Sequence, residues 1–559
     1  MALQGVVFED KKMLHNPHGY RNSRRSVVMA THGMVATSQP LAAQAGIDVL
    51  KAGGNAIDAA IAVNATLGVV EPMSCGIGGD LFAIIWNAST RELVGLNASG
   101  RSPYAATMDY FTSKGMAFIP DTGPLNWSVP GCVDGWNQLL SRFGRLTFQE
   151  ILAPAIGYAE NGFPVSDIIG IDWKGARPLL AEWPDAMRVF FPNNEAPNPG
   201  TLFRNPDLAR TYRLLAEGGR DSFYLGPVAE QIVSFSRQNG GLFAPEDFKD
   251  HFSTWDNPVC ANYRGYDVWE LPPNGQGIAA LQMLNILEGF DLPTFGSNSV
   301  DTLHLQIEAK KLAFADRAVY YADPAFADVP VEALLSKTYA DRLRQRIDIR
   351  QAARDVPPGD PALNRGDTAY LTVVDKEGNA VSLIQSIYRG FGSGIVPGHL
   401  GFPLQNRGQS FSLDPNHRNA LQPHKRPFHT IIPSMVTRDG QPWLSFGLMG
   451  GPMQPQGHVQ VLCNLIDFGM DIQEAGDCAR FNHSGSAEPT GTPMGPDGGL
   501  VSLEPSIGTD VAHGLVELGH KVVQTVHGFG GYQAILIDPD NGVLHGASEP
   551  RKDGCAIGY

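Results

Sequence analysis

Hydrophobic positions in the first part of the chain recur mostly at helical spacing. Residues 38–70 predict two helices, the first capped by Ser38 and stopped by the glycine pair at 53–54. The second begins at Asn55, and its apolar residues Ile57 and Ile61 stand among many alanines. We therefore expect a helix packed closely on both sides.

The pattern then alternates between short strands and longer helical stretches. A glycine-rich turn at 76–79 leads into the apolar strand "DLFAIIW", for which "ELVGLNASGRSP" is the expected partner. Residues 145–250 predict helices with polar loops, and residues 266–290 predict a strand, a loop and a helix. A long amphipathic helix is expected at 301–326, with Leu303, Ile307, Leu312 and Ala315 on one face. Residues 330–366 are polar and predict a surface segment or a linker.

After residue 367 the pattern changes to strands. The predicted strands are "AYLTVVD", "AVSLIQSI", "TIIPSMVTRDGQPWLSFGL" and "YQAILID". The chain is thus helix-rich before Thr368 and strand-rich after it. At 559 residues it is long enough for two or more lobes or for one large layered domain.

Composition and charge exclude several classes of protein. The 43% of apolar residues is ordinary for a globular protein, and the formal charge of −15 argues against binding to nucleic acid. No run of 18 apolar residues predicts a membrane span. The first residues show no apolar core behind a basic start, and no apolar segment follows the twin-arginine string "RNSRRS". We expect a cytoplasmic protein.

No cofactor or metal is predicted from local motifs. The six cysteines form no CxxC pair, and a disulfide framework is not expected in so long a chain. The string "GQGIAA" at 275–280 fits a dinucleotide loop, but a proline pair precedes it and no strand ending in an acid follows at the required distance. A plain helix-entry loop is the favoured interpretation. His304 and His458 are isolated, as surface or core histidines usually are.

Thr368 stands at the head of a predicted strand, directly after Asp367. A threonine hydroxyl is a weak nucleophile unless a base lies beside it. Peptide cleavage before a threonine supplies such a base, because it frees an α-amine with a pKa of about 7.7–8.0. The alternative is a β-branched residue that favours a strand. This residue alone favours the alternative.

Several long segments together resemble the γ-glutamyltransferase (glutathione hydrolase) family of N-terminal-nucleophile hydrolases. They occur in the order of the family and include "AGGNAIDAAIAVNATLGVVEPMSCGIGGDLF", "SVPGCVDGW", "EAKKLAFADRAVYYADPAF", "DTAYLTVVDKEGNAVS", "FGSGIVPGHLGFPLQN", "KRPFHTIIPSMV", "MGGPMQPQGH" and "GASEPRKDG". The resemblance implies an α+β fold, a four-layer αββα sandwich. It also implies a proenzyme that cleaves itself between Asp367 and Thr368. The large chain 1–367 and the small chain 368–559 would remain intertwined as a heterodimer.

The resemblance also implies roles for individual residues. Thr368 matches the nucleophile, and Ser386 matches a threonine that hydrogen-bonds the nucleophile in the family. Gly450 and Gly451 match the glycine pair whose N–H groups face the oxyanion. The implied reaction is attack of Thr368 on an amide, formation of an acyl-enzyme, and release of the acyl group to water or to a second amine.

The residues expected to bind substrate depart from the family. Ser99 aligns with the arginine that grips the substrate carboxylate, and Arg101 lies two residues further on. Where the family holds an α-ammonium or a carboxylate, this chain has Tyr388, Arg407, Ser410, His429 and Thr430. We expect Arg101, Tyr388, Arg407, His429 and Thr430 to bind the substrate.

Three functions stay open from the sequence. The first is cleavage of γ-glutamyl amides such as glutathione, the common role in the family. The second is an amidohydrolase or acylase for a carboxylate-bearing acyl group without an α-amine, such as oxamate or a glutaryl group, because Arg407, His429 and Arg101 suit an anion. The third is an uncleaved binding protein. The alternative to a role of Arg407 in substrate binding is that its side chain points outward or pairs with a carboxylate of the protein.

Overall fold

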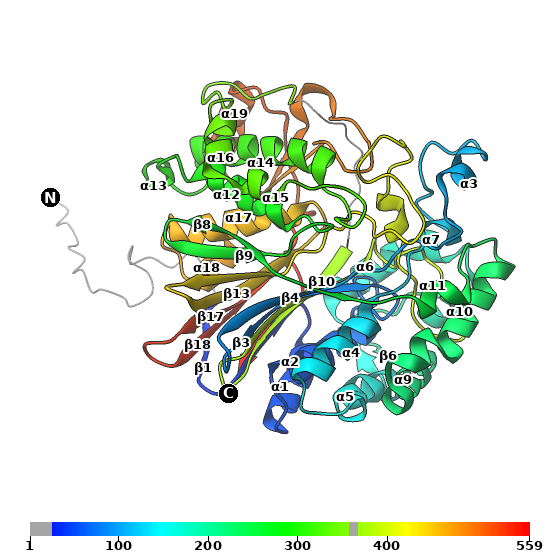
Figure 1. Ribbon diagram of the computed structural model, residues 1–559. Helices are drawn as coiled ribbons and strands as arrows, with labels where there is room; N and C mark the ends of the chain where they lie inside the picture. The colour runs from blue at the N-terminus through cyan, green and yellow to red at the C-terminus, as the bar shows by residue number, and fades with distance from the viewer. Residues whose placement is uncertain (1–24, 357–366) are drawn as a thin grey trace.

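Two seven-stranded antiparallel sheets are stacked between layers of helices in the computed structural model, which describes residues 25–356 and 367–559 (Figure 1). The first sheet consists, in spatial order, of β19 (Cys555–Gly558), β2 (Met34–Thr37), β10 (Asp367–Val374), β11 (Ala380–Tyr388), β3 (Asp80–Asn87), β4 (Glu92–Ala98) and β7 (Thr254–Asp256). The second consists of β1 (Val28–Ala30), β18 (Val543–Ser548), β17 (Gly531–Asp538), β13 (Gln441–Met449), β12 (Ser434–Arg438), β9 (Tyr266–Glu270) and β8 (Val259–Tyr263).

Helices cover the outer face of each sheet, which makes the αββα sandwich (Figure 1). The first sheet carries α1 (Pro40–Lys51), α2 (Ala56–Val70), α4 (Cys132–Phe143), α5 (Phe148–Asn161) and α9 (Pro206–Tyr224). The second carries α12 (Gly277–Leu287), α14 (Val300–Tyr320), α17 (Met453–Ile466) and α18 (Ile472–Asp477). A third apolar cluster, which includes Phe82, Tyr370 and Ile535, fills the space between the sheets.

The remaining helices and strands lie outside these two main layers of helices and the two large sheets. The helices are α3 (Met108–Thr112), α6 (Asp167–Gly175), α7 (Arg177–Leu180), α8 (Pro184–Phe190), α10 (Pro227–Gln238), α11 (Pro245–Lys249), α13 (Leu292–Phe295), α15 (Val331–Leu335), α16 (Lys337–Arg344) and α19 (Thr509–Glu517). A three-stranded sheet joins β14 (Phe481–Ser484), β15 (Leu500–Leu503) and β16 (Val522–Gln524), and β5 (Phe163–Pro164) pairs with β6 (Leu202–Phe203).

Local signals placed most elements correctly, with one error at the first helix. Asn55 caps α2 through a capping box with Asp58, as predicted, and α2 is buried on all sides. Ser38 does not cap α1, however. The cap is Gln39, whose side chain accepts from the Leu41 N–H, while the Ser38 hydroxyl donates to Glu71 at 2.5 Å. The hydroxyl of Ser38 is thus used by a distant carboxylate.

One prediction for the middle of the chain was wrong. The helix at 301–326, now α14, is not amphipathic, because Thr302 to Ala318 are buried on every side of it. Where it is described, the polar segment after residue 330 is a surface segment, as one of the two alternatives predicted, and it forms α15 and α16. Its last part, 357–366, lies outside the described residues.

The two expected chains contribute to both sheets. The first sheet takes β19, β10 and β11 from residues after 366, and β2, β3, β4 and β7 from residues before 357. β2 lies between β19 and β10, so strands from the two parts of the chain alternate. Cleavage before Thr368 would therefore leave two chains held together by shared sheets.

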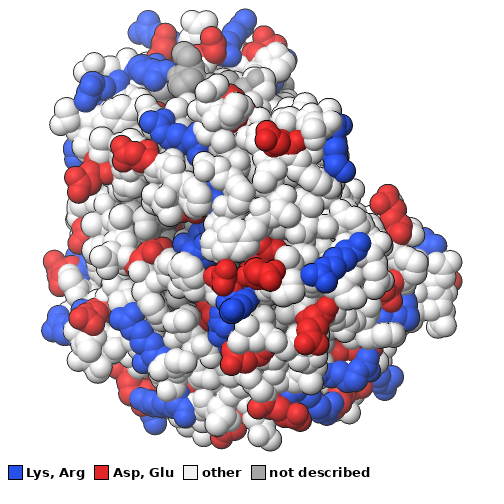
Figure 2. Space-filling view, turned by 45° about the vertical axis from the view of Figure 1, so that its right-hand side comes forward, with Lys and Arg blue, Asp and Glu red and all other residues white. Residues whose placement is uncertain are grey.

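Charged side chains of both signs lie on the surface. On the face shown in Figure 2, basic side chains are interspersed with acidic ones. Among the described residues, no helix is both long and apolar enough to span a membrane.

Candidate active site

Thr368 lies where the pairing of β10 and β11 is irregular. Asp367 is opposite Tyr388 and Ala369 is opposite Gln385, so two residues of β11 face the single residue Thr368. Such bulges redirect side chains and are common beside active sites. The Thr368 side chain is buried, and its hydroxyl donates to Ser386 Oγ at 3.3 Å. The contact between nucleophile and neighbour that the sequence predicted is therefore present.

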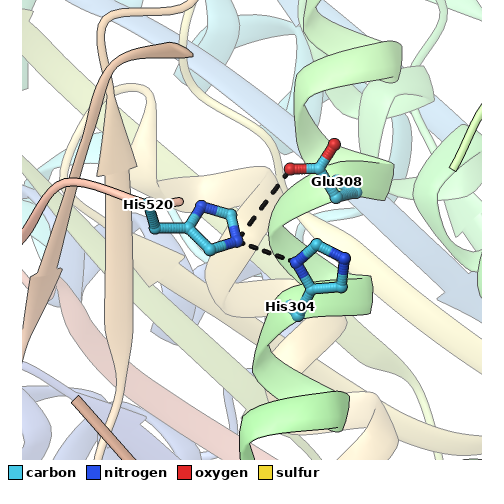
Figure 3. A group of neighbouring side chains, drawn as sticks. All are labelled: His304, Glu308 and His520. Carbon is cyan, nitrogen blue, oxygen red and sulfur yellow. Dashed lines mark hydrogen bonds and ion pairs between the residues drawn. The ribbon is translucent and has the colours of Figure 1, made fainter. Parts of the chain in front are cut away.

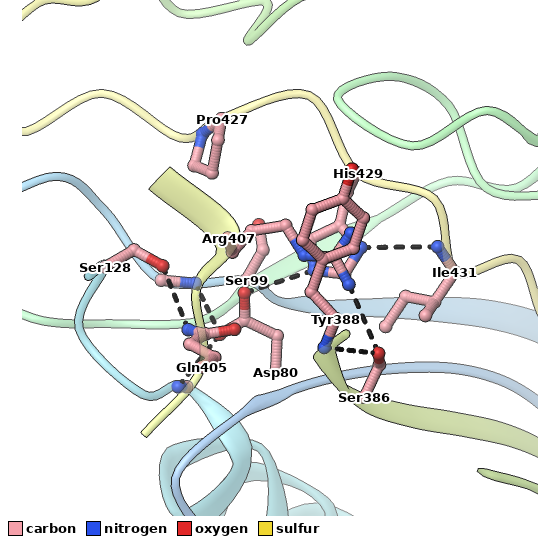
Figure 4. Close-up of polar contacts among 12 residues, drawn as sticks. Asp80, Ser99, Ser128, Ser386, Tyr388, Gln405, Arg407, Pro427, His429 and Ile431 are labelled. Carbon is pink, nitrogen blue, oxygen red and sulfur yellow. Dashed lines mark hydrogen bonds and ion pairs between the residues drawn. The ribbon is translucent and has the colours of Figure 1, made fainter. Parts of the chain in front are cut away.

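Ser386 accepts three hydrogen bonds at this point. Besides Thr368, the backbone N–H of Tyr388 donates to Ser386 Oγ at 2.8 Å, and Arg407 Nη2 donates to it at 3.3 Å (Figure 4). Tyr388 has a φ of +80°, a left-handed backbone that side chains rarely adopt. This turn directs the end of β11 towards Arg407.

Arg407 is a charged group that shares the acceptor Ser386 with Thr368. Its Nη1 donates to Thr430 Oγ1 at 2.9 Å, and its guanidinium lies 4.0 Å above the centre of the Tyr388 ring. The side chain is fully buried, so it does not point outward. Burial lowers the pKa of Arg407 to about 10, which leaves it a cation at neutral pH. No described carboxylate lies within ion-pair distance of it.

His429 lies beside Arg407 but is neutral. Its Nε2 is 3.1 Å from Asp80 Oδ2, and its Nδ1 accepts from the Ile431 N–H at 3.3 Å. The proton is therefore on Nε2, which donates to Asp80. Burial, and then the charge of Arg407, lower the pKa of His429 to about 4. His429 therefore adds no positive charge at neutral pH, in contrast to Arg407. Its role in binding substrate stays a prediction.

Asp80 is a residue of the site that the sequence did not single out. Its buried carboxylate accepts from the N–H groups of Gly100 and Gly131, from Gln405 Nε2 and from His429. The sequence did place Asp80 at the start of an apolar strand, and a buried carboxylate at such a position needs several hydrogen-bond donors. This was the signal that could have identified it. All of its donors come from distant segments, which no local pattern reveals.

Gly450 and Gly451 form the turn between β13 and α17. Their φ angles of +115° and +58° are left-handed, and a Cβ on Gly450 would lie 3.2 Å from the Gly530 Cα. The carbonyl of Gly451 accepts from Gln276 Nε2 at 2.9 Å, and the same Nε2 donates to the Thr430 carbonyl at 2.7 Å. A chain of hydrogen bonds thus joins this turn to Thr430, Arg407 and Ser386. The oxyanion role of the glycines stays a prediction.

The contacts of Arg101 lie outside this chain of hydrogen bonds. Its Nη1 donates to the Phe252 carbonyl at 2.9 Å, and its guanidinium lies 4.1 Å above the Phe252 ring. Ser99, at the aligned position, bonds to Asn97 and Asn274. The structure does not bring Arg101 into the hydrogen-bonded group of Thr368. Its role in binding substrate stays a prediction.

A cleft of about 390 Å³ opens next to this group. Arg389 to Gly392, which directly follow Tyr388, line one side, together with Asn406, which precedes Arg407. Asp121 pairs with Arg389 at 3.1 Å, and Asp172 lies on another wall. Because these lining residues are next to Tyr388 and Arg407 in the chain, the cleft is a candidate approach to the site for a small molecule.

His304, Glu308 and His520 form a separate buried cluster between α14 and the turn before β16 (Figure 3). His304 Nε2 donates to the Asp348 carbonyl, so its Nδ1 accepts from His520 Nε2, 2.8 Å away. The Glu308 carboxylate is paired with Lys311 at 2.7 Å. Each atom that faces the others is used by a hydrogen bond or an ion pair. We therefore assign the cluster to holding α14 against the last third of the chain.

Comparison with known proteins identifies the family. The model of the gamma-glutamyltranspeptidase family matches residues 42–559. The chain is 40% identical to the "Glutathione hydrolase-like YwrD proenzyme" of Bacillus subtilis, over 95% of this chain and 99% of that one. It is 34% identical to the "Glutathione hydrolase proenzyme" of Escherichia coli, over 95% and 93%.

A solved structure agrees with this. The crystal structure of cephalosporin acylase from Bacillus halodurans is 44% identical, with a TM-score of 0.88, and the match covers 99% of both chains. The family match runs through the buried site around Thr368 and through both sheets. The chain therefore belongs to the γ-glutamyltranspeptidase family of N-terminal-nucleophile hydrolases and is an enzyme of this type.

Proposed function

We propose that this enzyme is an acylase that cleaves amides of short dicarboxylic acids, such as a glutaryl amide, after cutting itself before Thr368. The observation that carries this proposal is the buried Arg407. It is a cation without a described ion-pair partner, and it shares the acceptor Ser386 with the nucleophile. A buried charge is costly unless an opposite charge compensates it, and a substrate carboxylate would do so.

The mechanism follows from the residues around Thr368. After self-cleavage, the free α-amine of Thr368 takes the proton of its own hydroxyl, and the oxygen attacks the amide carbonyl. The amine then passes the proton to the departing nitrogen, and the acyl group stays on Thr368 as an ester. Water attacks the ester and regenerates the enzyme. The N–H groups of Gly450 and Gly451 are the expected donors to the oxyanion, each worth about 2.7–4 kcal/mol in other enzymes.

The charges near Thr368 disfavour an α-ammonium on the acyl group. Arg407 would repel it, and the Asp80 carboxylate is already bound by four donors. The Arg407 guanidinium and the adjacent Thr430 hydroxyl instead offer hydrogen-bond donors that suit a carboxylate. The name of the similar cephalosporin acylase supports an acylase activity.

The second candidate is a glutathione hydrolase, which cleaves γ-glutamyl amides. The observation in its favour is the similarity over nearly the whole chain to the enzyme of that name from Escherichia coli. Both candidates use the same nucleophile and the same two-chain product of self-cleavage. They differ by one substituent of the acyl group, the α-amine, so substrates can separate them. The amine part of either substrate fits the cleft beside Arg389.

The test compares glutaryl p-nitroanilide with γ-glutamyl p-nitroanilide, which differ only in the α-amine. We expect kcat/KM to be at least tenfold higher for the glutaryl compound, because Arg407 attracts its carboxylate and meets no ammonium. Release of nitroaniline measures both rates. Preference for the γ-glutamyl compound would refute the acylase assignment and support the second candidate.

Ser386→Ala should slow both self-cleavage and turnover. The substitution removes the acceptor of Thr368 and leaves the Tyr388 N–H and Arg407 Nη2 without it. A buried donor without a partner costs about 1–3 kcal/mol, so we expect kcat to fall by roughly 10- to 100-fold. Ser386→Thr, which keeps the hydroxyl, is the control. An alanine variant with the kcat of the unchanged enzyme would show that this contact does not contribute.

A further inference from the structure

Gln276 joins two loops of the site that come from different strands. It is the residue before α12, in the string that resembled a dinucleotide loop, and it is fully buried. Its side chain does not cap its own helix. Instead, Nε2 donates to the Thr430 carbonyl at 2.7 Å and to the Gly451 carbonyl at 2.9 Å. One amide thus connects the segment before β12 with the turn after β13.

Arg317 on α14 fixes the orientation of this amide. Its Nη1 donates to Gln276 Oε1 at 2.6 Å, and because arginine only donates, the oxygen of the amide must face it. Arg317 is itself buried, paired with Glu488 at 2.5 Å, and lies 3.8 Å above the centre of the Phe314 ring. The NH₂ group of Gln276 is therefore held towards the two carbonyls.

The two loops have different predicted tasks. The Thr430 hydroxyl accepts from Arg407, where the acyl carboxylate is proposed to bind. Gly451 belongs to the glycine pair expected to face the oxyanion. The chain length of an acyl group limits the distance between its carboxylate and its reacting carbonyl. An active site must therefore hold these two loops at a matching distance, within a fraction of an ångström.

We propose that Gln276 is a positioning residue that sets the separation of the Thr430 loop and the Gly451 turn. The inference rests on the proposed function, since it takes both loops as parts of the acyl site. Gln276 touches no reacting atom, and it acts through the backbones of the two residues. Close packing supports it, because a Cβ on the following residue, Gly277, would lie 2.7 Å from the Glu270 Cβ. The start of α12 is thus fixed against β9.

The test uses Gln276→Leu and the near-isosteric Gln276→Glu, each assayed with glutaryl and valeryl p-nitroanilide. Valeryl p-nitroanilide has the same chain length but no carboxylate. We expect kcat to fall at least tenfold with both compounds, because the Gly451 turn moves. KM should rise in addition only for the glutaryl compound, because the Thr430 loop moves as well. The rate of conversion to two chains on a denaturing gel is a second readout. If the Gln276→Leu variant does not fold, the same measurements are made on Gln276→Glu alone.

Gln282→Leu is the matched control. Gln282 is buried on the same helix, donates to Asp316 and accepts from Tyr321, and so has equivalent contacts away from Thr430 and Gly451. It should lower the melting temperature without changing kcat or KM. If the Gln276 variants lose only melting temperature and keep their kinetics and conversion rate, the inference is overturned.

The test of Gln276 can fail independently of the proposed substrate class. The comparison of glutaryl with γ-glutamyl p-nitroanilide on the unchanged enzyme decides the proposed function alone. The effect on kcat of changing Gln276 is measured on whichever anilide the unchanged enzyme turns over faster. The gel measures conversion without any substrate.

Discussion

Thr368→Ala should leave the protein as a single uncut chain and abolish amide cleavage. The substitution removes the hydroxyl that donates to Ser386, at the irregular pairing of β10 and β11. Under the proposed function, Thr368 is needed both for cleavage of the preceding peptide bond and for attack on the substrate. Loss of a nucleophile in other hydrolases lowers kcat by about 10⁴-fold or more, so no turnover above background is expected. A denaturing gel with N-terminal sequencing of each band makes the measurement.

The unchanged protein is the reference for this experiment. It should give two bands, the smaller one beginning Thr-Ala-Tyr-Leu, as the sequence from Thr368 reads. Thr368→Ser keeps a hydroxyl and should still convert to two chains, though more slowly. If Thr368→Ala converts as the unchanged protein does, cleavage is not carried out by this residue and the assignment of the nucleophile fails. The two chains should stay associated, because β2 lies between β19 and β10.

The fold was predictable from the sequence where short-range signals decide it. The cap at Asn55 and the apolar, β-branched residues of β10 and β11 both lie within a few residues of the element they determine. The burial of α14 on all sides was missed, because its polar residues find partners far along the chain. Lys311, for example, pairs with Glu308 and also donates to the Ala353 carbonyl. Helical periodicity alone cannot show such partners.

The site was predictable only in part, for the same physical reason. Thr368 and Ser386 lie on paired strands of one hairpin, so their contact follows from local pairing and from the family resemblance. The link from His429 to Asp80 spans 349 residues and depends on how the sheets stack. Neutral His429 also shows that a residue type does not determine charge, since burial lowers its pKa to about 4.

Arg407→Gln should remove the preference for an acyl carboxylate. The guanidinium is the cation beside Ser386, and it is proposed to bind the carboxylate through charge-assisted hydrogen bonds. Such bonds contribute about 1.5–3 kcal/mol, so kcat/KM for glutaryl p-nitroanilide should fall by roughly 10- to 150-fold. The same substitution removes a repulsive charge, so kcat/KM for γ-glutamyl p-nitroanilide should fall less or rise. The ratio of the two rates is the decisive quantity.

Two controls separate substrate binding from support of the nucleophile. Arg407 also contacts Ser386 and Thr430, so its loss affects any substrate to some extent. Valeryl p-nitroanilide, which has no carboxylate, measures that common loss, and the specific effect is the additional fall with the glutaryl compound. Arg407→Lys keeps the charge without the planar pair of donors and should be intermediate. Equal losses for the glutaryl and valeryl compounds would mean that Arg407 holds Ser386 and Thr430 but does not bind the acyl carboxylate.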